Sequence, residues 1–537
     1  MSEPTTGAPD RPRVLVAEPL AAEGIEHLRA ECEVDDLRLD REELLKAIGE
    51  YDAVIVRSAT KLDREALERG ARLKVVGRAG VGLDNIDVEA ATRQGIVVVN
   101  APQSNVLSAA EHTVALMLAT ARSIPAAHAS LRSGRWERDR FTGVELHGKT
   151  LGVLGLGRIG TLVAQRASAF GMRLVAYDPY VSNQRAAQLG ITLVGTVEEL
   201  CRQADFLTVH LPKTAETKGI VGRRELRAMK PTARLVNASR GGIVDEEALH
   251  EALAEGVIAG AALDVFSKEP PGPLPLFEHD SIVVTPHLGA STEEAQTKAG
   301  TAIAEQVLIA LRGEIAPYAV NIAAGAEFVE VLRPFISLAE RLGRVLTGIA
   351  GAGISAVHFE YHGSVAEHDC RILTLAGLRG LFGAIVHEPV TFVNAPLIAA
   401  ERGIQVKETT SSISRDYVNL VVIHTESDRE SVAVGGTLVG KRDQERIVRV
   451  YDYEIEMAPE RYMCFIRYRD RPGIIGKVGS ILGSENVNVA SMLVGRQTIG
   501  GEALMALTVD SKIPGSMLER IVAEVEARDA KFIDLGG

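Results

Sequence analysis

The chain has 537 residues, of which 46% are hydrophobic and 24% charged, and its formal net charge at pH 7 is −12. This length and composition predict several globular domains, while the acidic balance argues against nucleic acid or an anionic membrane as the main partner. The four cysteines, Cys32, Cys201, Cys370 and Cys464, lie far apart without a C-x-x-C pair, which argues against a disulfide framework or a zinc motif and suits a reducing cytoplasm.

The N-terminal stretch MSEPTTGAPDRPR is polar and lacks the apolar core of a signal peptide. We expect a disordered leader there. No apolar run reaches the ~18 residues that a membrane span needs. The sequence therefore predicts a cytoplasmic protein with no membrane partner.

From Arg13 onward, short apolar runs alternate with amphipathic stretches, which is typical of a parallel sheet with helices on both faces. Ligands bind such sheets beyond the carboxyl ends of the strands. Arg57, Ser58 and Asn105 lie at or just after such ends, and for Arg57 and Ser58 an anion-binding role is one interpretation. A surface arginine and a turn serine are the alternative for Arg57 and Ser58.

Ser108 to Ala121 reads as a long helix between two lobes, with Ser108 as N-cap and Glu111 completing a capping box. Glu111 and His112 resemble a catalytic pair, but adjacent helical residues face different directions. We therefore expect capping for Glu111 and packing for His112. The basic segment 124–141 carries the only tryptophan, Trp136. It is either a helical surface with one anchored aromatic side chain, or an arm that brings Trp136 and Arg138 to an active site across a dimer interface.

Thr150 to Asp178 has the pattern of a dinucleotide-binding unit: apolar strand, glycine-rich turn, helix, second strand and acid. In its G-x-G-x-x-G turn, Gly155 permits the tight turn, Gly157 lets a pyrophosphate approach the backbone, and Gly160 lets helix and strand pack closely. Asp178 can bind the adenosine ribose and would repel a 2′-phosphate, so NAD is favoured over NADP. Arg158 either contacts the pyrophosphate or is a solvated arginine.

Three polar residues follow later strands of this second unit: Arg240, Glu269 and His287. An arginine can bind a carboxylate with two hydrogen bonds, and a histidine can act as general base for an alcohol. A carboxylate bonded to the imidazole fixes its tautomer. A surface arginine, a loop glutamate and a packed histidine are the alternatives, because spacing cannot show that the three side chains converge.

Many motifs resemble the D-2-hydroxyacid dehydrogenase family, namely VLGLGRIG, YDPY, HLPKTAET, NASRGGIVDEEAL, ALDVF followed by EP, and TPHLGAST. The motifs RSAT, GRAGVGLDNID and NAPQSN narrow the resemblance to its phosphoglycerate dehydrogenase branch, the first enzymes of the phosphorylated route to serine. The likeness runs from about Val14 to Asn321. It is specific, because the motifs occur in the right order.

The resemblance implies NAD as cofactor and D-3-phosphoglycerate as substrate, oxidised to 3-phosphohydroxypyruvate. It implies catalytic roles for Arg240, Glu269 and His287. It implies substrate contacts at Arg57, Ser58, Val81, Asn105 and Arg240. It implies cofactor contacts at Gly155, Gly157, Arg158, Ile159, Gly160, Asp178, Leu211, Ala238, Ser239, Asp264 and Gly289.

The C-terminal third shows no catalytic constellation. An intervening domain is either structural or, as the resemblance to the long-form enzymes implies, a possible effector site. Tyr462 to the C-terminus reads as a βαββαβ, ferredoxin-like order and resembles the ACT regulatory domain. That resemblance implies an L-serine site at Tyr468, Asp470 and Asn488; the alternative is a dimerisation module without ligand.

The expected fold is α/β: two doubly wound, Rossmann-like parallel-sheet lobes, an α+β intervening domain and a ferredoxin-like ACT domain. We predict a homo-oligomer, either dimer or tetramer, with no bound metal. A glyoxylate or hydroxypyruvate reductase is the first alternative, and a catalytically silent NAD-sensing protein is the second. The expected boundaries are 1–105 with 294–322 for a substrate lobe, 106–293 for the NAD lobe, 323–458 for the intervening domain and 459–537 for the ACT domain.

Overall fold

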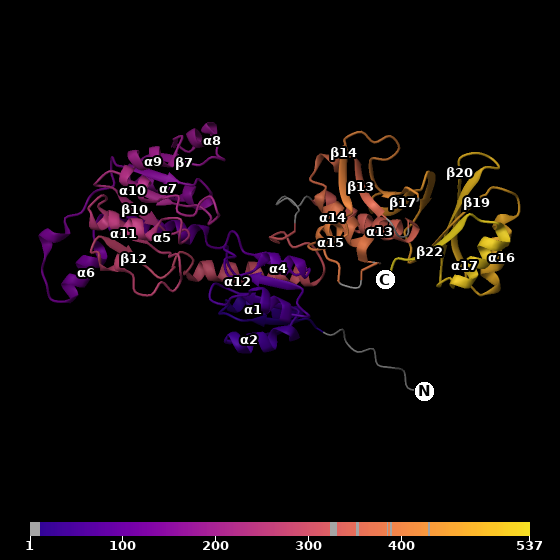
Figure 1. Ribbon diagram of the computed structural model, residues 1–537, viewed down its shortest axis with the longest axis horizontal. Coiled ribbons are helices and arrows are strands. Elements are labelled where there is room, and N and C mark those ends of the chain that lie inside the picture. Colours follow the sequence, from indigo (N-terminus) through magenta and orange to yellow (C-terminus); the bar gives the residue numbers. More distant parts are fainter. Residues whose placement is uncertain are drawn as a thin grey trace.

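The computed structural model describes residues 11–322, 330–350, 354–383, 385–386, 389–427 and 430–536. This part of the chain forms four units, each built on its own β-sheet, in an elongated arrangement (Figure 1). The unit that contains the glycine-rich turn lies at one end and the C-terminal unit at the other. The expected leader, apart from its last three residues, lies outside the described residues.

The first unit is a five-stranded parallel sheet in the order β2-β1-β3-β4-β5. Its central strands are short and buried on both faces, as in β3, which suits a parallel sheet covered by helices. A helix from much later in the chain, α12 (Glu293–Leu311), packs against α1 and β4. The elements are β1 (Arg13–Val16), α1 (Ala22–Glu31), β2 (Glu33–Asp36), α2 (Arg41–Ala47), β3 (Ala53–Val56), α3 (Arg64–Arg69), β4 (Val75–Arg78), α4 (Val88–Arg93) and β5 (Val97–Asn100).

The second unit is a seven-stranded parallel sheet in the order β12-β11-β10-β9-β6-β7-β8. The strand order reverses between β6 and β9, and the ends of strands at such a point form a ligand-binding crevice. Two helices, α5 (Val106–Ala121) and α6 (Ile124–Arg132), precede it. The elements are β6 (Thr150–Leu154), α7 (Arg158–Ala169), β7 (Arg173–Tyr177), α8 (Asn183–Gln188), β8 (Thr192–Leu193), α9 (Val197–Gln203), β9 (Phe206–Val209), α10 (Arg223–Ala228), β10 (Arg234–Asn237), α11 (Glu246–Ala254), β11 (Gly260–Leu263) and β12 (Ile282–Val284).

The third unit has a six-stranded mixed sheet in the order β14-β13-β15-β16-β17-β18, in which β13 and β14 alone are parallel. Two packed helices, α13 and α14, cover one face, where alternate residues of β13 are buried. The other residues of β13 face away from this core. The elements are α13 (Arg333–Ala350), β13 (Ile354–Gly363), α14 (Arg371–Gly383), α15 (Ala395–Glu401), β14 (Gln405–Ser411), β15 (Asn419–Ser427), β16 (Val432–Val439), β17 (Gln444–Val450) and β18 (Tyr453–Met457).

The fourth unit is an antiparallel sheet in the order β20-β21-β19-β22 with two helices on one face. The order βαββαβ is that of a ferredoxin-like fold, so this prediction is confirmed. The other face of the sheet packs into the core of the third unit through residues such as Met463 and Phe465. The elements are β19 (Tyr462–Arg469), α16 (Ile474–Ser484), β20 (Val489–Arg496), β21 (Glu502–Val509), α17 (Gly515–Val525) and β22 (Asp529–Asp534).

The start of α5 differs from the prediction. The helix begins at Val106 after Asn105, whose side chain makes no capping bond, so Ser108 lies inside the helix. The Ser108 hydroxyl instead bonds Thr292 Oγ1 at 2.8 Å, and Glu111 lies 3.6 Å from Arg166. The predicted capping box was wrong.

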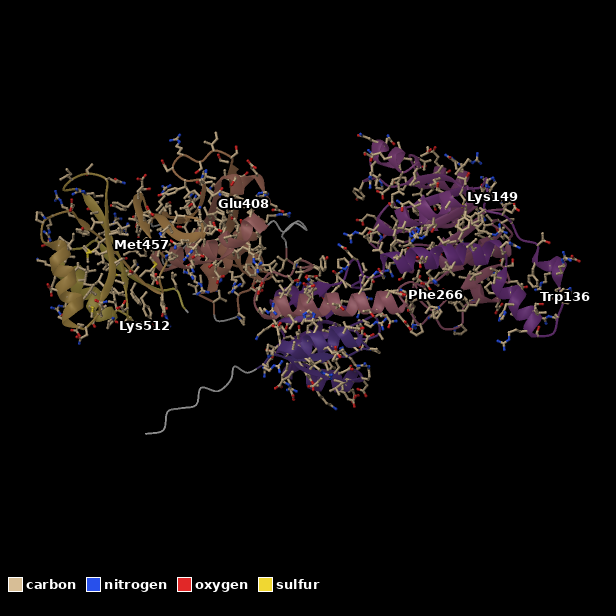
Figure 2. The ribbon with its side chains drawn as sticks, turned by 180° about the vertical axis from the view of Figure 1, so that it is seen from behind. Trp136, Lys149, Phe266, Glu408, Met457 and Lys512 are labelled. Atoms are coloured by element: carbon tan, nitrogen blue, oxygen red, sulfur yellow. The ribbon has the colours of Figure 1, made fainter. Side chains whose placement is uncertain are left out.

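The segment after α5 forms an arm at the outer edge of the second unit (Figure 2). Its helix α6 ends at Arg132, before the tryptophan. Trp136 is 80% exposed, so the interpretation as an anchored aromatic was wrong for a single chain. All four cysteines are buried and free, and no helix of the described residues is long and apolar enough to cross a membrane.

Candidate active site

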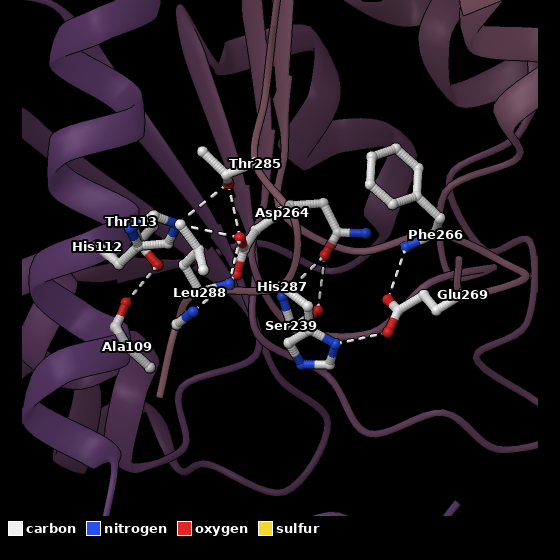
Figure 3. Close-up of polar contacts among 12 residues, drawn as sticks. Ala109, His112, Thr113, Ser239, Asp264, Phe266, Glu269, Thr285, His287 and Leu288 are labelled. Atoms are coloured by element: carbon white, nitrogen blue, oxygen red, sulfur yellow. Dashed lines mark hydrogen bonds and ion pairs between the residues drawn. The ribbon is translucent and has the colours of Figure 1, made fainter. Parts of the chain in front are cut away.

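A histidine and a glutamate meet beyond the strand ends of the second unit. His287 Nδ1 lies 2.7 Å from Glu269 Oε2, and the backbone N–H of Phe266 donates to Glu269 Oε1 at 3.0 Å (Figure 3). Burial disfavours the carboxylate, but these hydrogen bonds outweigh it and hold the pKa of Glu269 below its usual value. An ionised Glu269 accepts the Nδ1 proton, so Nε2 of His287 keeps its lone pair.

The turn that carries His287 is fixed by Asp264, which follows β11 and is fully buried. Its Oδ1 accepts hydrogen bonds from Thr285 Oγ1 at 2.6 Å and from the Leu288 N–H at 2.7 Å, and its Oδ2 accepts from the Gly289 N–H at 2.9 Å (Figure 3). Burial opposes ionisation, yet the bonds lower the pKa of Asp264. His287 itself adopts a left-handed backbone, φ 56°, a strained conformation that its surroundings must maintain.

His112 contributes to this turn from α5. Its Nε2 lies 3.1 Å from Asp264 Oδ1 and 3.2 Å from Thr285 Oγ1. The expectation of simple packing missed this polar contact, because the partners lie 152 and 173 residues further along the chain.

Arg240, three residues beyond the end of β10, reaches toward Asp84 of the first unit. Its guanidinium donates to the Ser239 carbonyl at 2.7 Å, and its Nε lies 3.2 Å from Asp84 Oδ2. Arg240 and His287 line the same cleft of about 470 Å³. Arg240 and His287 therefore share one cleft, and Glu269 is connected to it through His287, although Arg240 is paired with Asp84 rather than with the His287–Glu269 pair.

The glycine-rich turn has the geometry that a pyrophosphate requires. Gly155 has φ +97°, and a Cβ there would lie 2.6 Å from the His210 carbonyl oxygen; a Cβ on Gly160 would lie 2.1 Å from the Gly155 carbonyl oxygen. By contrast, the space beside Gly157 is open, and no side chain caps the start of α7. The free N–H groups of this helix start face the cleft and suit an anion.

The acid at the end of β7 lies beside this turn. Asp178 accepts hydrogen bonds from the Leu156 N–H at 2.8 Å and from the Tyr180 N–H at 2.9 Å. Arg158 extends outward and donates to the Pro102 carbonyl at 3.2 Å. Among the described residues, the turn, the uncapped helix and the acid together fit a dinucleotide.

The lining of the cleft includes most of the residues implied for cofactor and substrate. Asp264 lies behind its wall, and Gly155, Gly160 and Asp178 shape the turn rather than line the cleft. The implied residues that do line it are Val81, Asn105, Gly157, Arg158, Ile159, Leu211, Ala238, Ser239, Arg240, His287 and Gly289.

A smaller cavity of about 100 Å³ adjoins the cleft at His287 and Asn105, and its walls include Arg57 and Ser58. It also contains Arg78, at the end of β4, which the sequence analysis missed. The pKa of Arg78 is lowered to about 10, mainly by burial and to a lesser degree by repulsion from Arg240. In the described residues Arg78 Nε and Asn105 Oδ1 are buried without hydrogen-bond partners. Such orphaned groups cost about 1–3 kcal/mol each and suit an anionic, hydroxyl-bearing ligand.

A second missed residue is Glu18, just beyond β1. Its carboxylate accepts the N–H groups of Arg57, Ala59 and Thr60 at 2.8–3.2 Å. It therefore fixes the loop that presents Arg57 and Ser58. An acid directly after an apolar strand was the signal that could have identified it.

The implied effector residues have separate partners in the fourth unit. Asp470 pairs with Arg496 at 3.1 Å, and the Asn488 amide donates to Asp510 at 2.7 Å. Tyr468 is only 2% exposed and packs on the helical face of the sheet. The serine site stays a prediction.

Three family profiles match successive parts of the chain. They are the NAD-binding domain of D-isomer specific 2-hydroxyacid dehydrogenases at residues 114–289, the D-3-phosphoglycerate dehydrogenase intervening domain at 331–451, and the ACT domain at 462–526. The D-3-phosphoglycerate dehydrogenase of Methanocaldococcus jannaschii is 45% identical over 97% of this chain and 100% of its own. The D-3-phosphoglycerate dehydrogenase of Mycobacterium tuberculosis is 46% identical over 98% of this chain and 99% of its own length.

The chain belongs to the D-3-phosphoglycerate dehydrogenase family. It is thus an NAD-dependent dehydrogenase of the D-2-hydroxyacid type, and the predicted fold class is confirmed. Among solved structures, that of a glyoxylate reductase from Paecilomyes thermophila superposes on this chain with a TM-score of 0.52 and 30% sequence identity. The match includes 57% of this chain and 98% of the reductase chain. The structure of the D-lactate dehydrogenase of Escherichia coli matches 57% of this chain and 99% of its own chain, with 27% sequence identity and a TM-score of 0.51. Because such relatives differ in their named substrates, the fold alone does not select one.

Proposed function

We propose that the cleft oxidises D-3-phosphoglycerate to 3-phosphohydroxypyruvate with NAD, the first step of the phosphorylated route to L-serine. The main support is the cavity beside His287, where Arg57, Ser58 and the unpaired Arg78 surround a space suited to an anion. Arginine binds phosphate and carboxylate oxygens through charge-assisted hydrogen bonds. The names of the full-length relatives support the same substrate.

In this proposal His287 is the general base. Its Nε2 takes the proton of the C2 hydroxyl, while Glu269 keeps Nδ1 protonated and stabilises the imidazolium that forms. NAD, when bound, supplies the oxidant, because its nicotinamide ring accepts the hydride that leaves C2. The products are 3-phosphohydroxypyruvate, NADH and one proton.

Arg240 is proposed to bind the substrate carboxylate. The Asp84 side chain is 61% exposed, and ion pairs with exposed partners contribute little stability. The carboxylate of the substrate can therefore replace Asp84 as the partner of Arg240. Arg57, Ser58 and Arg78 would then hold the phosphate at the other end of the substrate. This places C2 between Arg240 and His287.

The residues of the glycine-rich turn are proposed to hold the dinucleotide: Gly157 and the start of α7 the pyrophosphate, and Asp178 the adenosine ribose. Leu211, Ala238, Ser239 and Gly289 line the remainder of the cleft. A carboxylate at position 178 would repel a ribose 2′-phosphate, which favours NAD over NADP.

Regulation and assembly are also proposed. The ACT domain is consistent with feedback by L-serine at Tyr468, Asp470 and Asn488. The exposed arm around Trp136 supports a homo-oligomer, dimer or tetramer, because a lone exposed tryptophan suits an interface. The boundaries given above and a cytoplasmic location complete the proposal.

A comparison of substrates tests the proposed reaction. Initial NADH formation is measured with D-3-phosphoglycerate and D-glycerate, and NADH consumption with glyoxylate and hydroxypyruvate, each with and without L-serine. We expect D-3-phosphoglycerate to be preferred by at least tenfold over D-glycerate, and serine to inhibit. A preference for glyoxylate or hydroxypyruvate would favour the reductase alternative, and NAD binding without turnover would favour the sensor. Turnover indifferent to serine would retain the reaction and reject the effector site.

A further inference from the structure

The sheet of the third unit has a polar face opposite its helices. Residues at alternate positions of β13 face away from the core, and among them are His358 and Glu360. On the neighbouring antiparallel strand β15, His424 pairs directly with His358 in the register. Two histidines and a glutamate from two strands therefore share one face. The face belongs to the unit shown in orange in Figure 1.

The three side chains converge. One ligand atom from each of His358, Glu360 and His424 lies within 4.8 Å of the other two. The His358 and His424 rings meet edge to face, with centroids 4.7 Å apart, and His424 Nδ1 lies 3.6 Å from Glu360 Oε1. Over the described residues, no other group of three such side chains is this close.

We propose that His358, Glu360 and His424 bind a divalent transition-metal ion of the zinc class. Two imidazoles and one carboxylate are a ligand set that zinc uses when a further position is left for water or another ligand. Bonds of about 2.0–2.2 Å bring tetrahedral ligand atoms to about 3.3–3.6 Å from one another. The 3.6 Å between His424 Nδ1 and Glu360 Oε1 already lies close to this range, and all three ligand atoms lie within 4.8 Å of one another.

A third histidine adjoins the cluster of His358, Glu360 and His424. His362, two residues beyond Glu360, lies 3.3 Å from Glu360 Oε2, so it can orient the carboxylate or complete the ligand set. The nearby cations already have partners: Lys407 pairs with Glu426 at 3.2 Å, and Arg449 lies 3.4 Å from Asp452. Among the described residues, Glu360 pairs only with the histidines His362 and His424.

A second hydrogen bond fixes one imidazole. His358 Nε2 lies 2.7 Å from Thr409 Oγ1 on β14, so strands β14, β13 and β15 all contribute to the arrangement. A metal bound here would join β13 to β15 and stabilise the folded third unit in proportion to its affinity. This inference is independent of the reaction proposed for the cleft.

Titration of the metal-stripped full-length chain tests the site. Zn²⁺ binding is followed by calorimetry, and Co²⁺ binding by its visible absorption. The wild type is expected to bind one equivalent at the site. His358→Ala and His424→Ala are each expected to weaken this affinity at least tenfold. Their activity without added metal should be unchanged, which also shows that they fold; His424→Gln carries the same expectation if the alanine variant does not fold.

The matched control removes another histidine pair. In the second unit, His279 Nε2 lies 3.0 Å from His250 Nδ1, and no third ligand of the described residues is close to this pair. The double variant His250→Ala/His279→Ala should bind metal as the wild type does. The proposal is overturned if the wild type does not bind, if affinity is unchanged in His358→Ala and His424→Ala, or if binding is abolished only by the control variant or by His287→Ala.

Discussion

At the scale of single residues, the cleft and its adjoining cavity combine a hydrogen-bonded histidine with two arginines, Arg57 and Arg78, whose side chains form no ion pair among the described residues. His287 gains its orientation from Glu269, while Arg78 has a buried Nε without a hydrogen-bond partner among the described residues and donates only a 3.4 Å hydrogen bond from Nη1 to the Ala79 carbonyl. A buried charge left unpaired destabilises a protein. The position of Arg78 beside Arg57 in the wall of one cavity is therefore best explained by the binding of an anion there.

The role of Arg78 gives the first prediction. Arg78→Gln should lower kcat/KM for D-3-phosphoglycerate by about 10- to 150-fold, because a hydrogen bond to a charged group contributes about 1.5–3 kcal/mol. The loss for unphosphorylated D-glycerate should be smaller, since that substrate has no phosphate to bind. Arg64→Gln, at an exposed arginine outside the cavity, is the control. Equal losses for both substrates would reject a phosphate contact.

The second prediction concerns Glu269. Burial opposes ionisation, but the hydrogen bonds from His287 and Phe266 lower the pKa of Glu269, so the carboxylate stays charged below the ordinary glutamate pKa and becomes neutral only as the pH falls through the folded-state value. Glu269→Gln, which cannot ionise, should therefore reduce kcat by a similar factor at pH 6 and pH 9, by about 10- to 100-fold. The difference from wild type should shrink only in acid. A rate loss that disappears near neutral pH would show that Glu269 is not the ionised partner.

At the scale of elements, the site depends on turns that follow strands. Asp264 accepts hydrogen bonds from the turn 285–289, and Glu18 accepts those from the loop 57–60. Both acids connect segments that are distant in sequence. The two turns therefore keep the base and the anion site in place before any ligand binds.

The third prediction tests the turn at Asp264. Asp264→Asn should lower both kcat and the melting temperature, because an amide nitrogen would face the N–H groups that the carboxylate now accepts. The folded-state pKa is depressed, so the stabilisation is present above the unfolded-state value near 3.9 and is lost as the pH falls through the folded-state value. The difference in melting temperature should therefore narrow below about pH 4. Asp280→Asn, at a 71%-exposed side chain, should change stability by less than ~0.5 kcal/mol; a comparable loss in both variants would contradict the account.

Sequence patterns predicted the elements well where periodicity was strong. The apolar runs of β3 and β6 and the glycine-rich turn identified both parallel sheets. The start of α5 was predicted too late because Ser108 and Glu111 have the spacing of a capping box. The helix in fact begins after Asn105, which ends a tight turn at the cleft. Arg78 was missed because it ends an apolar strand, and its lack of a partner is visible only in three dimensions.

At the scale of the whole molecule, the ACT domain is joined to the intervening domain by a buried arginine. Arg467 of β19 has a side chain 8% exposed and reaches Glu430 at 2.6 Å and Asp529 at 3.1 Å. Its guanidinium lies 4.1 Å from the centre of the Tyr451 ring. Asp529 belongs to the fourth unit like Arg467 itself, whereas the contacts with Glu430 and Tyr451 cross to the third unit, so they can couple an effector site to the rest of the chain.

The fourth prediction is that Arg467→Met separates these two units. Removing one member of a fully buried ion pair costs about 3–5 kcal/mol, and we expect roughly 1–3 here, because the acids are partly exposed. Calorimetry should show an earlier transition for the ACT domain, with NAD-dependent activity largely retained. Arg520→Met, at the exposed pair with Glu524, is the control. A single unchanged transition would reject the coupling.

The most direct test of the account is NADH formation from D-3-phosphoglycerate and NAD by the wild type and His287→Ala, side by side. The account predicts steady turnover by the wild type and a loss of ~10²–10⁴-fold in kcat for the variant, with NAD affinity retained. His250→Ala should match the wild type. Full turnover by His287→Ala, or no turnover of this substrate by the wild type, would contradict the proposed reaction at this cleft.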